Sequence, residues 1–168
     1  MRRNLLITGA AITVGTIMAD QLTKVWIRES FALGESVHVI GPIFFTHVLN
    51  TGAVFGLGQG YVIIPTIATI VVLALIPIIL RHLIVHHNFA PNILEIISVA
   101  LIAGGAIGNL IDRIIFRGVT DFIDIEILPG IRWPAFNVAD ASIVVGTLLL
   151  LFVMYRRGTS TGEQTGGA

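Results

Sequence analysis

Acidic side chains are concentrated in one part of this chain, the segment from Gly104 to Asp140. The sequence contains five aspartates, and four fall here: Asp112, Asp121, Asp124 and Asp140. Asp112 and Asp140 lie within or beside long apolar runs, where a carboxylate is costly and is usually retained for a function. Two carboxyl groups that share a proton can hydrolyse an amide, because the ionised one activates water while the protonated one donates to the carbonyl. The spacing favours this chemistry but leaves open which two act.

Other hydrolytic chemistries lack their motifs in this sequence. There is no G-x-S-x-G and no H-E-x-x-H pattern, and cysteine is absent, which excludes a thiol nucleophile, thiolate metal ligands and disulfides. His82, His86 and His87 have helical metal-ligand spacing, but no carboxylate lies near them in sequence to complete a site. We therefore expect no metal and no other cofactor, and the role of the histidines stays open.

The composition is that of a protein embedded in a lipid bilayer. Of the 168 residues, 55% are hydrophobic and 12% are charged, and the mean hydropathy is +0.92. Soluble domains carry about 25% charged residues, so this chain has too few to cover a surface that faces water. Because the net charge is zero and no basic patch is present, nucleic acid is excluded as a partner.

Four apolar stretches are each close to the ~20 residues that cross the hydrocarbon core. They cover about residues 4–26, 61–80, 92–115 and 138–155. This predicts an all-α membrane fold with four transmembrane helices in a single domain, residues 1–157, and a polar tail, 158–168, that is disordered. The first stretch is too long for the apolar part of a signal peptide and lacks a small-x-small cleavage site, so we expect it to remain in the protein as a membrane span.

Positive charge indicates which helix ends face the cytoplasm. Arg2 and Arg3 precede the first span, Arg156 and Arg157 follow the last, and Arg81 lies between the second and third. Because an even number of spans puts both termini on one side, the positive-inside rule predicts cytoplasmic termini. The acid-rich segment then lies near the outer face.

Two substantial loops, residues 27–60 and 116–137, fall on the outer side. In the first loop, apolar and polar residues alternate in places on either side of Gly41-Pro42. This pattern predicts short strands joined by a turn, and so a small β-rich subdomain. The second mixes apolar and charged residues and is predicted to carry a short interfacial helix.

Polar residues near the outer ends of two spans lie at helical spacing. Asp20 and Lys24 are four residues apart and share a helix face, as do Asn109 and Arg113. A structural ion pair, with the lysine extending towards water, is an equally good interpretation of the first pair. Glycines before Asn109 are typical of close helix packing, and the polar pair beyond them favours a functional layer.

Asp140 also has a purely structural interpretation. Asn137 followed three residues later by Asp140 is the pattern of a helix start, with Asn as N-cap and an acid that the helix dipole stabilises. Taken singly, Asp121, Asp124 and Glu126 are acids of a loop. From the residues alone, capping therefore accounts for Asp140 without any chemistry.

Five short blocks in this order resemble the bacterial lipoprotein signal peptidase family, signal peptidase II. They are D-Q-L-T-K at 20–24, N-T-G-A-V-F at 50–55, G-G-A-I-G-N-L-I-D-R at 104–113, V-T-D-F at 119–122 and F-N-V-A-D at 136–140. Chain length and the number of spans agree with that family too. Thr120 stands where the family often has Val, a change expected to matter little.

The resemblance implies an aspartic endopeptidase of the bacterial inner membrane that cuts prolipoproteins just before the lipid-modified cysteine of the lipobox. The implied catalytic pair is Asp121 and Asp140, with Asp124 as the main competitor of Asp121. The implied supporting residues are Asp20, Lys24, Asn50, Gly52, Asn109, Asp112, Arg113 and Asn137. The implied partners are lipidated precursors and membrane lipids, the implied inhibitor is globomycin, and we expect a monomer.

A second class of protein also fits opposed acids and bases among four spans, a small proton-coupled carrier. A carrier is expected to show polar residues through the membrane midplane and a pseudo-repeat. Here the second span and the middles of the first and fourth are Ile, Val, Leu and Ala, and polarity is confined to one face. This favours a site at the membrane boundary over a path across it; a non-catalytic scaffold is a weaker, third alternative.

Overall fold

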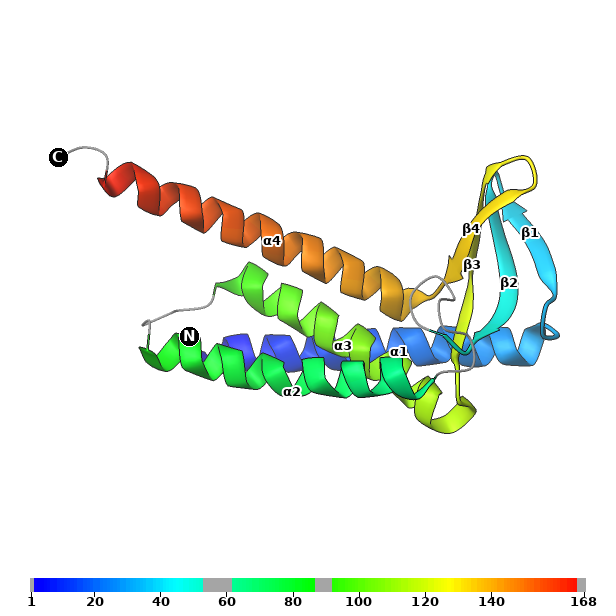
Figure 1. Ribbon diagram of the computed structural model, residues 1–168, viewed down its shortest axis with the longest axis horizontal. Helices are drawn as coiled ribbons and strands as arrows, with labels where there is room; N and C mark the ends of the chain where they lie inside the picture. The colour runs from blue at the N-terminus through cyan, green and yellow to red at the C-terminus, as the bar shows by residue number, and fades with distance from the viewer. Residues whose placement is uncertain (1, 53–61, 87–91, 166–168) are drawn as a thin grey trace.

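The chain folds into four helices and one four-stranded sheet. The computed structural model describes residues 2–52, 62–86 and 92–165. The elements, in chain order, are α1 (Arg2–Ser30), β1 (Ser36–Ile40), β2 (Ile43–Asn50), α2 (Ile63–His86), α3 (Ile93–Phe116), β3 (Val119–Leu128), β4 (Ile131–Phe136) and α4 (Val138–Thr165). The helices run roughly alongside one another, and the sheet stands at one end of them (Figure 1).

Helix α3 is the centre of the bundle, because it packs against both α1 and α4. Two glycines allow this close approach. A Cβ atom at Gly105 would collide with the carbonyl oxygen of Ala139 in α4, and one at Gly108 would lie 2.5 Å from Oδ2 of Asp20 in α1. The glycines predicted to serve packing do so, and they bring the polar segments of three helices to one level.

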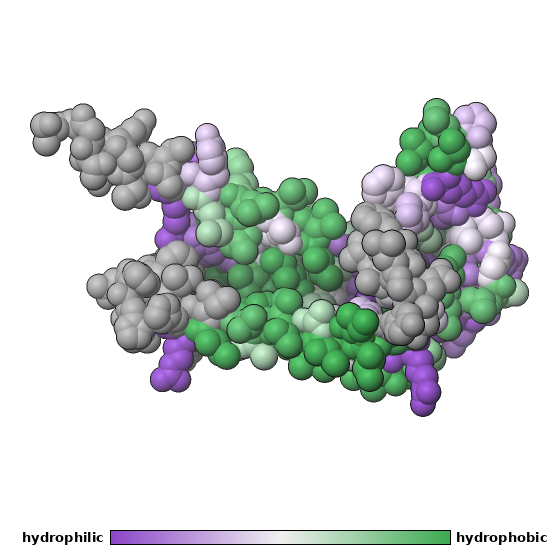
Figure 2. Space-filling model, in the orientation of Figure 1, coloured by the Kyte–Doolittle hydropathy of each residue, from purple (hydrophilic) through white to green (hydrophobic). Residues whose placement is uncertain are grey.

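Three helices are long and apolar enough to cross a bilayer, at Asn4–Ser30, Ile93–Phe116 and Val138–Arg157. In α2 the apolar stretch among the described residues is shorter, Ile63–Ile78. Apolar side chains cover much of the helical surface, with hydrophilic groups near the two ends (Figure 2). A membrane protein with four helices is therefore confirmed, while crossing by all four stays a prediction.

The sheet is antiparallel, in the order β1-β2-β3-β4. Strands β1 and β2 confirm the hairpin predicted around Gly41-Pro42, where Gly41 has a φ of 54°. Strand β2 pairs with β3 through Val48 opposite Asp121 and Asn50 opposite Val119. This pairing places the end of β2 beside the start of β3, close to the helix ends.

The short interfacial helix predicted within 116–137 is wrong. These residues form the β3–β4 hairpin, with Gly130 in its turn at a φ of 78°. Val119–Leu128 is rich in Val, Ile, Phe and Thr, which fit a pleated, half-buried surface. Pairing with β2 satisfies the backbone of this strand, and that tertiary contact outweighs the mixed local pattern.

Three helices continue several residues beyond their expected ends, and one of them, α2, runs to His86 instead of residue 80. Helix α1 runs to Ser30 instead of residue 26, and α4 runs to Thr165, into the tail expected to be disordered from residue 158. Once a helix exists, each further residue adds one hydrogen bond at little extra cost. His87 and residues 53–55 of the second family block lie outside the described residues, as do the side chains of His82 and His86.

Candidate functional site

The start of β3 and the start of α4 bring Asp121 and Asp140 to the same asparagine. Nδ2 of Asn137 donates to Oδ1 of Asp121 at 2.6 Å. The backbone N–H of Asp140 donates to Oδ1 of Asn137 at 2.9 Å, and the N–H of Asn137 donates to Oδ2 of Asp140 at 3.3 Å. The predicted helix cap is therefore present, and its asparagine also holds a second carboxyl group.

Asp121 is held in a setting that favours its protonated form. The residue is 2% exposed, and its Oδ2 accepts a hydrogen bond from Nδ2 of Asn50 at 2.9 Å. Burial, and next the negative charge of Asp140, raise the pKa of Asp121 to about 7, although the amides of Asn50 and Asn137 and the charge of Lys24 act in the opposite direction. A carboxyl group with this pKa can hold or release a proton near neutral pH.

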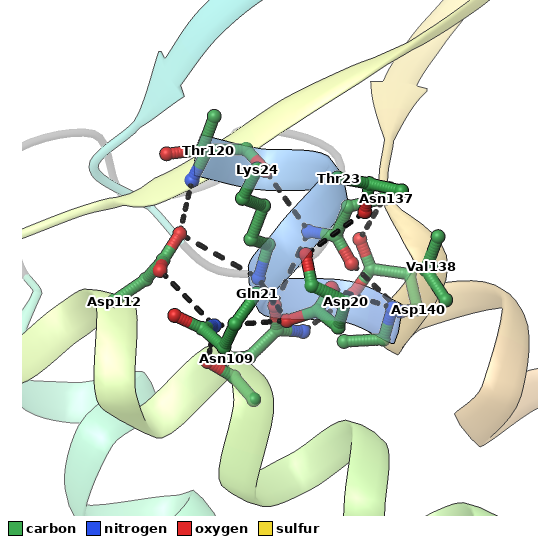
Figure 3. A network of polar contacts seen from close by, with 12 residues as sticks. Asp20, Gln21, Thr23, Lys24, Asn109, Asp112, Thr120, Asn137, Val138 and Asp140 are labelled. Carbon is green, nitrogen blue, oxygen red and sulfur yellow. Dashed lines mark hydrogen bonds and ion pairs between the residues drawn. The ribbon is translucent and has the colours of Figure 1, made fainter. Parts of the chain in front are cut away.

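Lys24 forms the centre of a buried network next to Asp121 and Asp140. Its Nζ lies 2.8 Å from Oδ2 of Asp20, 3.5 Å from Oδ2 of Asp112 and 2.9 Å from Oδ1 of Asn109. All three charged side chains are fully buried. Figure 3 shows Lys24 extending from α1 between these partners instead of towards water. The structural ion pair predicted for Asp20 and Lys24 is thus correct, but it is part of a larger network.

Asp20 and Asp112 each hold the backbone just before one of the two candidate carboxyl groups. Oδ1 of Asp20 accepts the N–H of Ala139, which precedes Asp140, at 2.9 Å. Oδ2 of Asp112 accepts the N–H of Thr120, which precedes Asp121, at 2.9 Å. Lys24 joins the two, so one cation on α1 ties together the segments that carry both carboxyl groups.

The amide of Asn109 can have only one orientation in this network. Its Oδ1 faces both Nζ of Lys24, at 2.9 Å, and Nδ2 of Asn137, at 3.2 Å. An ammonium group has donors only, so the atom facing it must be the carbonyl oxygen. Nδ2 of Asn109 is then directed at Oδ1 of Asp140, at 2.8 Å. The buried cation therefore fixes a donor to Asp140.

A cavity of about 530 Å³ opens onto both carboxyl groups. It is bounded by polar residues of the site and by apolar residues of β4 and α4, among them Trp133, Pro134, Val144 and Val145. Arg113 lines it too, and within the described residues the buried Nε of Arg113 has no hydrogen-bond partner. The cavity thus combines an apolar wall with a proton-bearing carboxyl group and an unused donor, which suits hydrolysis of an amide in an apolar chain.

Asp124, the competitor of Asp121, lies outside this group. Its Oδ2 is 2.7 Å from a terminal nitrogen of Arg132 and accepts from Oγ1 of Thr46 at 2.8 Å. Gly52, predicted as a supporting residue, donates its N–H to Oδ1 of Asn50 at 3.0 Å and so orients that amide. Among the described residues, no three His, Asp or Glu side chains are grouped to hold a metal ion.

Sequence reasoning missed two members of the network. Gln21 donates to Oδ2 of Asp20 at 3.0 Å and to Oδ1 of Asp112 at 3.3 Å. Arg28 lies 3.6 Å from Oδ1 of Asp112 and donates to Oγ1 of Thr120 at 2.8 Å. Arg28 continues the i, i+4 line of Asp20 and Lys24, a signal that was available in the sequence. Gln21 gave no comparable signal.

Comparison with known proteins identifies the family. The family model for signal peptidase II matches residues 12–156. Lipoprotein signal peptidases of Moorella thermoacetica and Halothermothrix orenii are 42% and 36% identical to this chain, over 86% and 84% of it and 91% and 90% of their own length. A bacterial membrane enzyme solved at 2.3 Å superposes with a TM-score of 0.78 and 31% identity, covering 91% of this chain and 90% of its own.

These matches decide against the carrier and the scaffold. They also explain why most of the buried polar residues lie near the end of the bundle that carries the sheet, since a peptidase needs a site and not a path. The chain belongs to the signal peptidase II family of aspartic peptidases, and it is a multi-pass bacterial membrane enzyme that cleaves signal peptides from prolipoproteins.

Proposed function

We propose that Asp121 and Asp140 are the catalytic pair and that they cut the precursor just before its lipid-modified cysteine. The observation that carries the proposal is that one residue, Asn137, holds both carboxyl groups at the same cavity: its side-chain amide donates to Asp121 and its backbone N–H donates to Asp140. Asp121 lies next to a second carboxyl group with its pKa near 7, which is the arrangement that a shared-proton pair requires.

The hydrogen bonds suggest how the first step divides between the pair. Asp121 holds a proton and donates it to the carbonyl oxygen of the scissile bond. Both oxygens of Asp140 accept N–H donors, from Asn109 and Asn137, which orients this carboxylate to take a proton from the attacking water. Water oxygen then bonds to the carbonyl carbon, which gives a tetrahedral intermediate with two hydroxyl groups. As the C–N bond breaks, the proton on Asp140 passes to the leaving nitrogen and one hydroxyl group returns its proton to Asp121, so a carboxylic acid is released and the pair regains its starting state.

Arg113 is the residue best placed to hold the substrate backbone. Its side chain lines the cavity with both carboxyl groups, and among the described residues its buried Nε is left without an acceptor. A carbonyl oxygen of the precursor can accept this donor, and the positive charge stabilises the negative charge that develops during attack. Every residue named in the reaction belongs to one chain, so a monomer suffices.

The proposed topology places this site at the outer face, with both termini in the cytoplasm. Single cysteines can test it, because the chain contains none. Glu35→Cys and Glu126→Cys, on the sheet side, are expected to react with an impermeant thiol reagent added outside intact cells, whereas Glu163→Cys is not. The reverse labelling pattern contradicts the orientation.

Cleavage of two matched precursors tests the specificity and the catalytic pair together. The purified protein is expected to cleave a diacylglyceryl-modified precursor and to leave the unmodified form intact, with the new N-terminus at the lipidated cysteine. Asp140→Asn keeps the helix-capping hydrogen-bond acceptor but loses the proton acceptor, so it is expected to fold and to lose cleavage. If Asp140→Asn still cleaves, Asp140 acts only as a cap.

A further inference from the structure

The end of the sheet remote from the catalytic pair is apolar and exposed. Ile127, Leu128 and Ile131 form the tip of the β3–β4 hairpin and are 55%, 58% and 57% exposed. Ile40, the last residue of β1 before the turn to β2, is 68% exposed. The two turns lie side by side, because Ile43 pairs with Ile125 and the N–H of Glu126 donates to the carbonyl of Pro42 at 2.8 Å. We call these four aliphatic side chains the sheet tip.

The sheet tip lies to one side of the helices, past the end of α4 that is nearest the sheet (Figure 1). The strands run across the direction of the helices, so the hairpin reaches out to the side of α4 (Figure 1). In the space-filling view, apolar side chains gather at this end of the sheet on the side that faces back along the helices (Figure 2). With the helices in a bilayer, this side faces the lipid next to α4.

We propose that the sheet tip is inserted into the headgroup and acyl-chain boundary of the leaflet on the site side of the membrane. Membrane lipid is the occupant because the apolar side of the tip faces back along the apolar surface of membrane-crossing helices. Burial of exposed aliphatic surface is favourable by roughly 25 cal/mol per Å², and the segment 127–131 carries no charge that would oppose it.

The residues that flank the sheet tip suit a lipid interface. Glu126 and Arg132 bracket the apolar turn, so their charges can stay among the headgroups. Trp133 follows, 46% exposed, and tryptophan is enriched at membrane–water interfaces. Insertion would hold β4, with Trp133 and Pro134 in the cavity wall, above the lipid from which a membrane-embedded precursor arrives.

A matched pair of single cysteines tests the depth of the tip. Leu128 and Leu33 are the same residue type and are 58% and 67% exposed. Leu33 follows the end of α1, which at 29 residues is about 43 Å long and exceeds a hydrocarbon core of about 30 Å. Leu128→Cys and Leu33→Cys, each carrying a nitroxide, are reconstituted in phosphatidylglycerol and phosphatidylethanolamine bilayers.

Power saturation then compares collisions of each nitroxide with oxygen, which concentrates in lipid, and with a water-soluble nickel chelate. We expect oxygen to dominate at 128 by severalfold and the nickel chelate to dominate at 33. Equal access of the chelate to both positions would overturn the proposal, and so would exclusion of both reagents from 128, which would indicate a protein partner such as a second copy of the chain. The measurement needs no catalysis, so it is independent of the catalytic pair proposed above.

Activity provides a second measurement on the same two positions. Leu128→Asp is expected to raise KM for the membrane-embedded precursor severalfold with little change in kcat, because the charge withdraws the tip while the catalytic groups stay in place. Leu33→Asp is expected to leave both constants unchanged. If Leu128→Asp leaves KM unchanged as well, the tip does not help to position the cavity wall over the lipid.

Discussion

Strand β3 holds two aspartates three residues apart, and their surroundings differ in kind. Asp121 and Asp124 are 2% and 5% exposed, so burial does not distinguish them. Asp121 is surrounded by neutral amides and a second carboxyl group, and its pKa is raised to about 7. Asp124 is paired with Arg132, whose guanidinium also stacks over the ring of Phe44 at 3.9 Å.

The difference shows that the partner, and not burial, decides what a carboxyl group can do. Asp124 joins β1, β2 and β4 through Thr46 and Arg132, because the same nitrogen of Arg132 also donates to Ser36 at 2.9 Å. Its charge is neutralised by one cation and used to hold the sheet together. Asp121 has no cation in direct contact within the described residues, and with its pKa raised to about 7 it can hold or release a proton near neutral pH.

The largest expected effect is on cleavage by the asparagine variants of these two residues. Asp121→Asn keeps size and hydrogen bonding but cannot transfer a proton, so cleavage is expected to fall about 10²- to 10⁴-fold or more. Asp124→Asn is expected to keep substantial activity. Binding of precursor by Asp121→Asn is expected to stay within about tenfold, or about 1.4 kcal/mol.

Measuring cleavage and binding for both variants at one pH separates the alternatives. An inactive Asp124→Asn beside an active Asp121→Asn would reverse the assignment of the two aspartates. Normal cleavage by both variants would show that neither aspartate of β3 takes part in hydrolysis.

Lys24 links the supports of the two segments that carry the proposed catalytic pair, so its removal is expected to cost stability as well as activity. Lys24→Met leaves Asp20 and Asp112 buried without their shared cation, which is expected to destabilise the fold by about 3 to 5 kcal/mol. Thermal unfolding in detergent measures this. Adding Asp20→Asn to Lys24→Met removes one unpaired charge and is expected to recover part of the loss; an unchanged unfolding temperature in Lys24→Met would contradict the role of the network.

The raised pKa of Asp121 predicts a pH-dependent stability with a definite sign. Its folded-state pKa, about 7, lies above its ordinary value of 3.8, so the stability it contributes is fully present below about pH 4 and is lost as pH rises through 7. At pH 8, Asp121→Asn is therefore expected to be more stable than the native sequence, by up to about 4 kcal/mol.

Chemical unfolding at pH 5 and pH 8 measures this effect, and Asp124→Asn is the matched control on the same strand. The gain for Asp121→Asn should grow between the two pH values. A gain that is equal at both would show that Asp121 is ionised throughout this pH range.

The smallest expected effect concerns the ion pair of Asp124 with Arg132. Arg132→Gln removes the cation from Asp124 and is expected to cost about 1 to 3 kcal/mol of stability, less than Lys24→Met because Arg132 is partly exposed. The pH profile of cleavage should not move, since Arg132 does not contact the proposed catalytic pair. A shifted profile would show that the Asp124–Arg132 pair is electrostatically coupled to Asp121.

Local patterns in the sequence determined the class of protein and the placement of its polar layer. Low charge and apolar stretches of spanning length required a membrane protein, because a chain with so few charged residues cannot cover a surface in water. The spacing of Asp20 with Lys24, and of Asn137 with Asp140, predicted an ion pair and a helix cap that the structure contains. These features depend on residues within one helical turn of each other.

The family blocks also indicated which residues belong together, but not how they act on one another. The sequence left Asp121 and Asp124 as two acids of one loop and predicted a helix where β3 and β4 form. Strand β3 exists because it pairs with β2, about 75 residues earlier in the chain, a contact that no local pattern encodes.

Tertiary structure alone decided the surroundings of each acid. Asn137 reaches Asp121 across 16 residues, Lys24 reaches Asn109 across 85, and Arg132 neutralises Asp124 within the hairpin. The pKa of a carboxyl group depends on burial and on the charges within a few ångströms. Those neighbours come from α1, α3, α4 and two strands, so they are fixed only when the helices pack and the sheet closes over their ends.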